Sequence, residues 1–275
     1  MTMMIHEKKP ILISFLIVNY QSLTELEVAL HDLNAVIPAR SCEILIANND
    51  SAPLPKTIKR IVTNALYTEV YNLSSNQGFG VANNYIAKKA QGTYLFFLNP
   101  DTYNFSGDLM GLVKMIEQRV CDVIAPTITN ADGSPQVWSY GKMITPRSIV
   151  SSNLLKNDTK SGTGFQCDQA TKDVDWVTGA AFLIKKTDFQ EVGGFDERFF
   201  LYFEDIDLCK RLVEKEKKIL VSQEMKLKHK SGASAKNSLS QKAHYYKAQN
   251  YYLKKHYGKT VAKVFSLLRG ITHPL

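Results

Sequence analysis

The stretch Gly194-Phe-Asp-Glu-Arg-Phe-Phe-Leu-Tyr-Phe-Glu-Asp-Ile-Asp-Leu-Cys-Lys-Arg211 interleaves charged side chains with aromatic rings. A solvated surface would not carry so many rings, and an ordinary core would not carry so many charges. Acidic residues suit the positive end of a helix dipole, so we predict a helix that begins near Glu204. Asp205 then faces the core side, and Asp207 pairs with Arg211 one turn later.

Two interpretations of this stretch are open. A carboxylate held between aromatic rings in a half-dry site is what a general base requires, which would give Asp205 a catalytic role. In the second interpretation, Glu204 and Asp205 only stabilise the start of the helix, and the rings only pack. Spacing alone favours neither, because structural carboxylates also lie in such surroundings.

The chain before this stretch alternates apolar runs with helical patterns. Runs rich in β-formers lie at 11–18, 43–47, 70–73, 94–98 and 122–125. Polar clusters follow three of them, at Asn19-Tyr20, Asn48-Asn49-Asp50 and Asn99-Pro100-Asp101. Each cluster alone is typical of a turn. Together they predict an open α/β sheet whose polar clusters converge on a ligand crevice at the carboxyl ends of the strands.

The remaining segments are expected to complete this sheet. Residues 127–173 are rich in turn formers and predict a hairpin followed by a loop that closes over the site. Further strands are predicted at 176–184, where Gly179 allows close backbone approach, and at 217–221. His229 lies just beyond the second of these strands, and a single histidine is more often structural than functional.

Length and composition indicate one large domain, or one domain with an appendage. The chain has 275 residues, of which 44% are hydrophobic, and its four cysteines are too scattered for a metal site. Such cysteines are typical of reduced thiols in a cytosolic protein. The apolar run at 11–18 is too short to span a bilayer and does not resemble a signal peptide, so we expect a cytoplasmic protein.

The net charge of +8 is distributed unevenly along the chain. Residues 1–209 contain 18 Lys and Arg against 23 Asp and Glu, whereas residues 210–275 contain 16 against 3. A basic segment of this kind indicates nucleic acid or an anionic membrane as a partner, or only a solubilising surface. Helices are predicted over 241–257, which carries five tyrosines, and over 259–269.

Five motifs, in this order along the chain, resemble those of family 2 glycosyltransferases of the GT-A fold, particularly the bacterial rhamnosyltransferase-like branch. They are Val18-Asn-Tyr20, Asn76-Gln-Gly-Phe-Gly-Val-Ala-Asn-Asn84, Asn99-Pro-Asp101, Trp176-Val-Thr-Gly-Ala180, and Gly194-Phe-Asp-Glu197 continuing to Glu204-Asp205. The resemblance implies a GT-A type, Rossmann-like open sheet in a catalytic domain over 1–230. A helical, basic C-terminal extension would follow over 231–275.

The resemblance also implies roles for the matched residues. Asp205 would be the catalytic base, with Glu204 beside it, and Tyr20 would stack on the base of the nucleotide. The nucleotide sugar would be bound by Val18, Tyr20, Asn48, Asn76, Gly78, Asn84 and Asn99. The acceptor would be bound by Trp176, Gly179 and Ala180. Asp101 and His229 would hold Mg²⁺ or Mn²⁺.

Two departures from the family pattern bear on these roles. Relatives often have Asp at the position of Asn48, although a carboxamide oxygen still accepts a hydrogen bond from a pyrimidine N3–H. Asn99 replaces the first carboxylate of the metal motif. Asp101 is then the main anionic ligand, which suits an ion held largely by substrate phosphates and water.

The function implied is an inverting, metal-dependent glycosyltransferase of bacterial surface polysaccharide synthesis, such as that of lipopolysaccharide. It would move a sugar from a nucleotide diphosphate, with dTDP-rhamnose favoured over a UDP-hexose, to a hydroxyl of a glycan or polyprenyl-linked saccharide. A metal-dependent sugar nucleotidyltransferase is an alternative, but it requires a Gly-rich basic loop that Asn19-Tyr-Gln-Ser22 does not provide. A dinucleotide-binding oxidoreductase is disfavoured, because Gly78-Phe-Gly80 lacks the full fingerprint. A non-enzymatic basic nucleic-acid or membrane-binding protein would not explain the acidic clusters.

The C-terminal extension is expected to hold the enzyme on the inner face of the bacterial cell membrane, and nucleic acid is not expected as a partner. Tyrosines favour the interfacial layer and lysines favour anionic headgroups. The helix over 259–269 carries an apolar side that is too short to cross a bilayer, formed by Val261, Val264, Phe265 and Leu268. Alternatively, this side packs on the body of the same chain. It could also pack on a second subunit, and the protein would then be a homo-oligomer.

Overall fold

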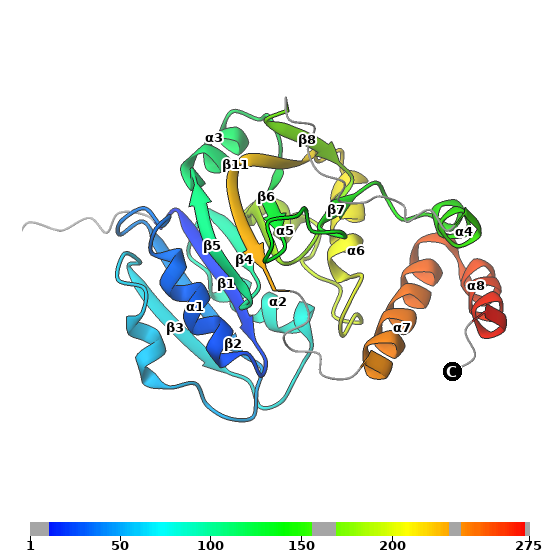
Figure 1. The fold of residues 1–275 in the computed structure, drawn as a ribbon, viewed down its shortest axis with the longest axis horizontal. Coiled ribbons are helices and arrows are strands. Elements are labelled where there is room, and N and C mark those ends of the chain that lie inside the picture. Colours follow the sequence, from blue (N-terminus) through cyan, green and yellow to red (C-terminus); the bar gives the residue numbers. More distant parts are fainter. Residues whose placement is uncertain (1–10, 156–168, 231–237, 273–275) are drawn as a thin grey trace, which may run out of the picture.

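The protein is described by a computed structural model that covers residues 11–155, 169–230 and 238–272. Within these ranges, a mixed sheet of nine strands forms the centre, in the order β3-β2-β1-β4-β10-β6-β11-β5, and β8 pairs with β11 (Figure 1). The strands are β1 (Ile13–Asn19), β2 (Cys42–Asn48), β3 (Tyr67–Asn72), β4 (Tyr94–Leu98), β5 (Thr102–Gly107), β6 (Val123–Thr129), β8 (Thr171–Val174), β10 (Ala181–Lys185) and β11 (Ile219–His229). The predicted open α/β sheet is confirmed.

Helices cover both faces of this sheet and bury two apolar cores against it. One face carries α1 (Leu23–Leu33) and α3 (Leu109–Glu117), and the short 3₁₀ helix η1 (Lys56–Arg60) lies near the sheet edge at β3. The other face carries α2 (Phe79–Lys89), α5 (Lys186–Glu191) and α6 (Glu204–Val213). All residues of β1 and β2 are buried, because both faces of these parallel strands are covered.

Two predicted strands differ from the structure. The strand expected over 176–184 is two strands, since a turn at 178–180 separates β9 (Trp176–Val177) from β10, and β9 pairs with β7 (Tyr140–Gly141) in a separate small sheet. The turn lets the backbone of Gly179 approach α6. The strand expected over 217–221 continues through a register shift between Ser222 and Lys226, so that His229 is its last residue, opposite Thr102 of β5.

The local predictions for the stretch that ends at Arg211 are confirmed. Helix α6 begins at Glu204, and Arg211 Nε donates to Asp207 Oδ2 at 2.8 Å. The two residues before the helix, Tyr202 and Phe203, have φ angles of 71° and 66°. This left-handed pair turns the chain sharply at the helix start.

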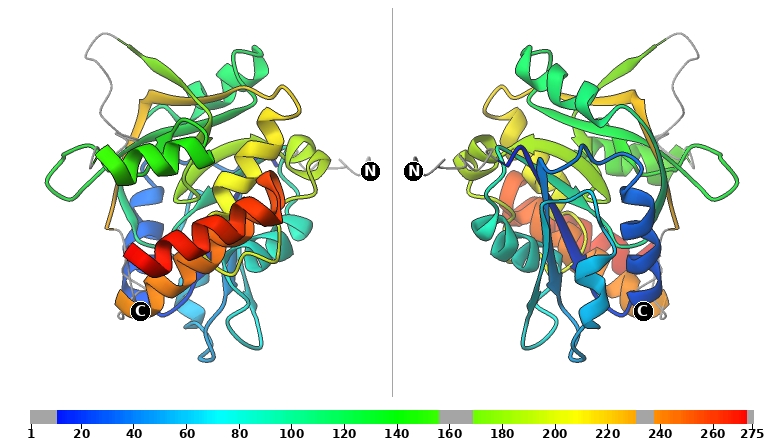
Figure 2. Two further views of the ribbon diagram at one scale, coloured as in Figure 1. Left: turned by 90° about the vertical axis from the view of Figure 1, so that its right-hand side faces the viewer. Right: turned by 90° about the vertical axis from the view of Figure 1, so that its left-hand side faces the viewer.

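The C-terminal helices pack on the body. In Figure 2, α7 (Ser238–Tyr257) and α8 (Lys259–Thr272) lie together on one side of the molecule, with α4 (Pro146–Leu155) beside α8. Tyr252 and Leu253 of α7 are fully buried, and Ala262 of α8 packs with Leu253 and with Ile149 of α4. Of the helices described, none has the length and hydrophobicity to cross a membrane.

The segment over 127–173 is partly as predicted. A hairpin turn is present, with a bridge between Thr129 and Pro135 around Asp132-Gly133. Helix α4 and strand β8 follow it, and these were not predicted. The loop expected to close over the site includes residues 156–168, which lie outside the described residues.

Candidate active site

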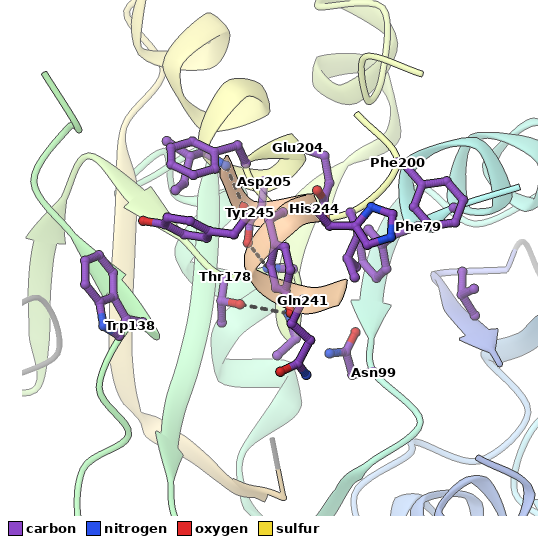
Figure 3. A pocket seen from close by; sticks show the side chains of 18 of the residues that line it. Phe79, Asn99, Trp138, Thr178, Phe200, Glu204, Asp205, Gln241, His244 and Tyr245 are labelled. Carbon is purple, nitrogen blue, oxygen red and sulfur yellow. Dashed lines mark hydrogen bonds between the residues drawn. The ribbon is translucent and has the colours of Figure 1, made fainter. Parts of the chain in front are cut away.

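A cavity of about 1050 Å³ opens at the carboxyl ends of β1, β2 and β4. Tyr20, Asn49 and Asp101 line one side of it, and Glu204 and Asp205 line the other, so the predicted convergence of the polar clusters is confirmed. Figure 3 shows Trp138 on one side of the cavity and His244 beside Phe200 on the other, with Asp205 and Tyr245 between them. Large, partly apolar clefts with a few convergent polar groups are typical of ligand sites.

Asparagine side chains form part of the cavity wall near the carboxyl ends of β1 and β2. Asn49 Nδ2 donates to Asn76 Oδ1 at 2.9 Å, and Asn76 Oδ1 also accepts from the backbone N–H of Gly78 at 3.0 Å. Gly78 has φ of 86°, and a Cβ there would lie 2.5 Å from the Phe200 carbonyl oxygen. Only glycine lets the start of α2 approach the loop at Phe200 this closely. Val18, Tyr20, Asn76, Gly78 and Asn99 all line the cavity, as expected of donor-binding residues.

Two residues predicted to bind the nucleotide do not line the cavity. Asn48 is fully buried, and its amide accepts from Asn19 and donates to Asn72 and to the Ala52 carbonyl. Asn84 is buried and holds both backbone groups of Phe195, each at 2.9 Å. Both amides hydrogen-bond within the protein and support loops next to the cavity, so the structure does not place them where a donor would contact them. The adjacent Asn49 lines the cavity in place of Asn48.

Asp101, His229 and Gln136 form a chain of contacts at the end of β11. Gln136 Nε2 donates to the His229 carbonyl at 3.0 Å, and Gln136 Oε1 lies 2.8 Å from His229 Nδ1. Nδ1 therefore carries a proton, and Nε2 faces Asp101 Oδ1 at 3.0 Å. Asn99 Nδ2 also lies 3.4 Å from Nε2, so the imidazole, the carboxylate and the carboxamide meet at one point.

This arrangement fits a divalent metal held partly by substrate. The described residues contain no group of three His, Cys, Asp or Glu side chains that would hold an ion by themselves. Asp101, His229 and the nearby Asn99 amide offer one carboxylate, one imidazole and one carboxamide. A donor set this small leaves the remaining positions to phosphate oxygens and water, which Mg²⁺ and Mn²⁺ accept.

The two acidic residues at the start of α6 face the same cavity. Asp205 Oδ2 accepts from the Gly179 N–H at 2.9 Å, and Oδ1 accepts from the Ile206 N–H at 2.8 Å. Glu204 is 5% exposed, and its Oε2 has no hydrogen-bond partner among the described residues. The two carboxyl groups are therefore unequal, because both oxygens of Asp205 accept a backbone hydrogen bond and Oε2 of Glu204 accepts none among the described residues.

Burial raises the pKa of both carboxyl groups. The pKa of Glu204 lies well above its usual range, first because of burial and then because of the charge on Asp205. The backbone donors oppose this effect at Asp205. The backbone donors favour the ionised form of Asp205 over that of Glu204, so Asp205 is the better candidate to accept a proton from a substrate.

The predicted acceptor residues Trp176, Gly179 and Ala180 line the cavity. Trp176 is only 2% exposed because the ring of Trp138 stacks on it, with centroids 6.4 Å apart. Residues that sequence reasoning missed complete this wall: Gln136, Trp138, Thr178, Phe200, Gln241, His244 and Tyr245. The tyrosine-rich pattern of 241–257 was the available signal, but it was interpreted as a membrane contact.

The basic C-terminal region is neutralised in part by the acidic body. Lys255 Nζ lies 2.7 Å from Asp196 and 2.6 Å from the fully buried Asp207, and His256 Nε2 lies 2.7 Å from Asp207. Lys217 pairs with Asp188 at 2.8 Å. The basic charge of these residues is therefore paired within the chain. No external partner is needed to explain it.

Comparison with known proteins agrees with this geometry. Residues 14–206 match the model of Glycosyl transferase family 2. Rhamnosyltransferase WbbL of Escherichia coli is 31% identical over 62% of this chain and 66% of its own length. The N-acetylglucosaminyl-diphospho-decaprenol L-rhamnosyltransferase of Mycobacterium tuberculosis is 25% identical over 63% of this chain and 61% of its own length. The chain thus spans less than two thirds of the length of these relatives.

The fold has solved counterparts as well. The crystal structure of residues 1–349 of TarS from S. aureus aligns with a TM-score of 0.57 and 16% identity, covering 87% of this chain and 64% of that one. The shared architecture is the open α/β sheet of the GT-A fold. The family match spans more than half of the chain and includes β1, the asparagine wall, Asp101 and the Glu204-Asp205 pair, so this protein belongs to glycosyl transferase family 2.

Proposed function

We propose that this glycosyltransferase is inverting and metal-assisted, and that residues 1–230 form its catalytic domain. The observation that carries the proposal is Asp205, a carboxylate with raised pKa held by Gly179 in a cavity that also contains Asp101 and His229. Tyr20, Asn76 and Asn49 would hold the nucleoside of the donor. Trp176, Gly179 and Ala180 would border the acceptor.

Asp101 and His229, with Asn99 beside them, would hold Mg²⁺ or Mn²⁺. The ion would neutralise charge that develops on the leaving diphosphate. Gln136 keeps the His229 ring oriented through Nδ1. Such outer contacts fix the tautomer of a ligating histidine.

Asp205 would act as the general base. It would take the proton of an acceptor hydroxyl as that oxygen forms a bond to the anomeric carbon of the donor sugar. The bond from the anomeric carbon to the diphosphate oxygen breaks on the opposite face, and the nucleoside diphosphate leaves with the bonding electron pair. The configuration at the anomeric carbon inverts. Glu204, whose pKa is raised by burial and by the charge on Asp205, would keep a second negative charge out of the site.

The donor and acceptor are proposed from the relatives. Two of them are named as rhamnosyltransferases, and one name specifies an N-acetylglucosaminyl-diphospho-decaprenol acceptor. We therefore favour dTDP-rhamnose as donor, with a UDP-hexose as the alternative. The acceptor would be a saccharide hydroxyl on a glycan or a polyprenyl-linked sugar of a bacterial surface polysaccharide.

A lipid-linked acceptor would bring the enzyme to the cytoplasmic face of the membrane. Val264, Leu267 and Leu268 on α8 are 47%, 62% and 49% exposed, and Lys259 and Lys263 on the same helix are exposed. An apolar strip beside lysines suits an anionic bilayer surface. The opposite side of α8 packs on the body through Ala262, so only part of the expected apolar side is available.

Ligand binding by the purified protein tests this function. We expect dTDP-rhamnose with Mn²⁺ to raise the melting temperature and ADP-ribose to have no effect, because a ligand that binds only the native state stabilises it. Slow hydrolysis of the stabilising nucleotide sugar would show that the protein cleaves the bond between the sugar and the diphosphate. Stabilisation by nucleoside triphosphates, with release of pyrophosphate from them, would instead support a nucleotidyltransferase.

A further inference from the structure

Helix α7 lies beyond residue 206, where the family match ends, yet it forms part of the cavity wall. Gln241, His244 and Tyr245 line the cavity from this helix. His244 stacks on Phe200 with ring centroids 5.1 Å apart, and Tyr245 lies 5.3 Å from Phe203. Figure 3 draws Tyr245 and Asp205, the proposed base, among the side chains that line this cavity. The cavity that contains the base is therefore walled in part by a segment of this chain outside the family match.

Aromatic residues of this wall are held in an uncommon backbone conformation. Trp138, Tyr202 and Phe203 line the cavity and have φ angles of 66°, 71° and 66°. A positive φ is unfavourable for bulky side chains, and such strain persists mainly at functional sites. Trp138 is also 50% exposed, although its ring stacks on Trp176. A large ring fixed in place and open to the cavity offers a flat surface to a ligand.

The wall is supported by a buried ionic cluster that joins α7 to the helix of the base. Asp207 lies two residues after Asp205 on α6 and contacts Arg211, Lys255 and His256. Tyr252 of α7 is fully buried and donates to the carbonyl of Ile144, which itself lines the cavity. Side chains on helices that are anchored in this way are held accurately relative to a reacting group.

We propose, on the basis of the proposed function, that Trp138 and Tyr245 bind the faces of the acceptor sugar ring whose hydroxyl reaches Asp205. A pyranose ring carries C–H groups on its faces and hydroxyl groups at its edge. Flat aromatic rings with polar groups in the same cavity, here Thr178 and Gln241, match that distribution. The ligand is thus a saccharide, and the helix that recognises it lies outside the part of the chain shared with the family.

Calorimetric binding of two synthetic probes tests this inference. Decyl N-acetylglucosaminyl diphosphate carries a sugar, and decyl diphosphate lacks it. With dTDP and Mn²⁺ present, we expect wild-type protein to bind the first probe about tenfold more tightly, since two aromatic contacts are at stake. Tyr245→Ala and Trp138→Ala should each reduce this preference by about threefold or more and leave dTDP affinity unchanged.

Tyr85→Ala is the control, because Tyr85 is an exposed tyrosine on α2 that does not line the cavity. It should keep the full preference for the sugar-bearing probe. Equal binding of both probes by the wild type would overturn the inference, as would the same loss in the Tyr85 and Tyr245 variants. Failure of the proposed function would appear separately, as absent dTDP binding before any probe is added. Trp138 is half exposed, so its variant keeps the test valid if the Tyr245 variant folds poorly.

Discussion

The backbone N–H of Gly179 donates a hydrogen bond of 2.9 Å to Oδ2 of Asp205. This bond joins the turn between β9 and β10 to the first turn of α6. A Cβ at Gly179 would lie 3.0 Å from the ring of Phe79, so glycine allows the close approach. The carboxylate is thereby held in the cavity with a backbone donor on each oxygen.

Asp205→Asn should reduce turnover by about a hundredfold or more, because the amide keeps the shape but cannot accept the proton. Donor affinity should remain nearly unchanged. Steady-state transfer rates and calorimetric dTDP binding measure the two quantities. Asp173→Asn, at an exposed position on β8, is the control and should behave as wild type. A variant of Asp205 with near-full transfer would exclude its role as base.

Glu204→Gln should change how stability depends on pH. The pKa of Glu204 is raised above its ordinary 4.5 by burial and by the Asp205 charge. The folded state therefore keeps the proton after the unfolded chain has lost it, and stability falls as pH rises from 4.5 toward the raised pKa. Between pH 5 and 8, the unfolding free energy of wild type should fall relative to the Gln variant, by at most about 1.4 kcal/mol per pH unit.

Urea denaturation of both proteins at several pH values measures this difference. The exposed Glu214→Gln variant should show no such trend. A difference between wild type and Glu204→Gln that stays constant with pH would mean that Glu204 is ionised in the folded protein.

Asp101→Ala should abolish Mn²⁺-dependent donor binding. EDTA should abolish the transferase activity of the wild type. His229→Ala should show a weaker form of the same defect, since one carboxylate would remain. Mn²⁺ titrations by calorimetry in the presence of dTDP measure both. Full activity in EDTA would disprove the metal role.

Gln136→Leu should weaken Mn²⁺ binding by about tenfold or more, although Gln136 is not itself a proposed ligand. The reason is that Gln136 fixes the ring of His229 through a 2.8 Å contact. Gln118→Leu, on the exposed end of α3, is the control. Unchanged Mn²⁺ affinity in the Gln136 variant would mean that its contact with His229 does not contribute to metal binding.

Asp207→Ala should lower the free energy of unfolding by about 3 kcal/mol or more, because it removes a fully buried carboxylate that three partly buried side chains share. Arg211, Lys255 and His256 all contact this carboxylate. Urea denaturation measures the loss, and Asp173→Ala should cost at most about 0.5 kcal/mol. A similar small loss at Asp207 would mean that α7 is held by apolar packing alone.

Leu267→Ser with Leu268→Ser should reduce binding to anionic vesicles, and high salt should weaken wild-type binding similarly. Both side chains are exposed, so the melting temperature should not change. Val120→Ser, at an exposed apolar position near α3, is the control for co-sedimentation. Normal vesicle binding by the double variant would exclude this surface, and a change in oligomeric state would identify it as a subunit contact.

The sequence alone determined the sheet and the main polar residues of the site. Buried strands are visible as short apolar runs such as 11–18, and parallel strands must end at one edge, so their polar ends had to meet. The start of α6 at Glu204 followed from local helix electrostatics. Local spacing made Asp205 one candidate for a base, and the family resemblance selected it over a purely structural role.

Only the tertiary structure decided which distant residues join that edge. Gln136 reaches His229 across 93 residues, and α7 reaches the cavity from beyond the family match. Periodicity reports the exposure of a helix face but not its partner, so the tyrosines of α7 were assigned to a membrane. In the structure, Lys255 and His256 of this helix contact the buried Asp207 instead. Such pairing depends on how two elements pack, and packing is a property of the whole chain.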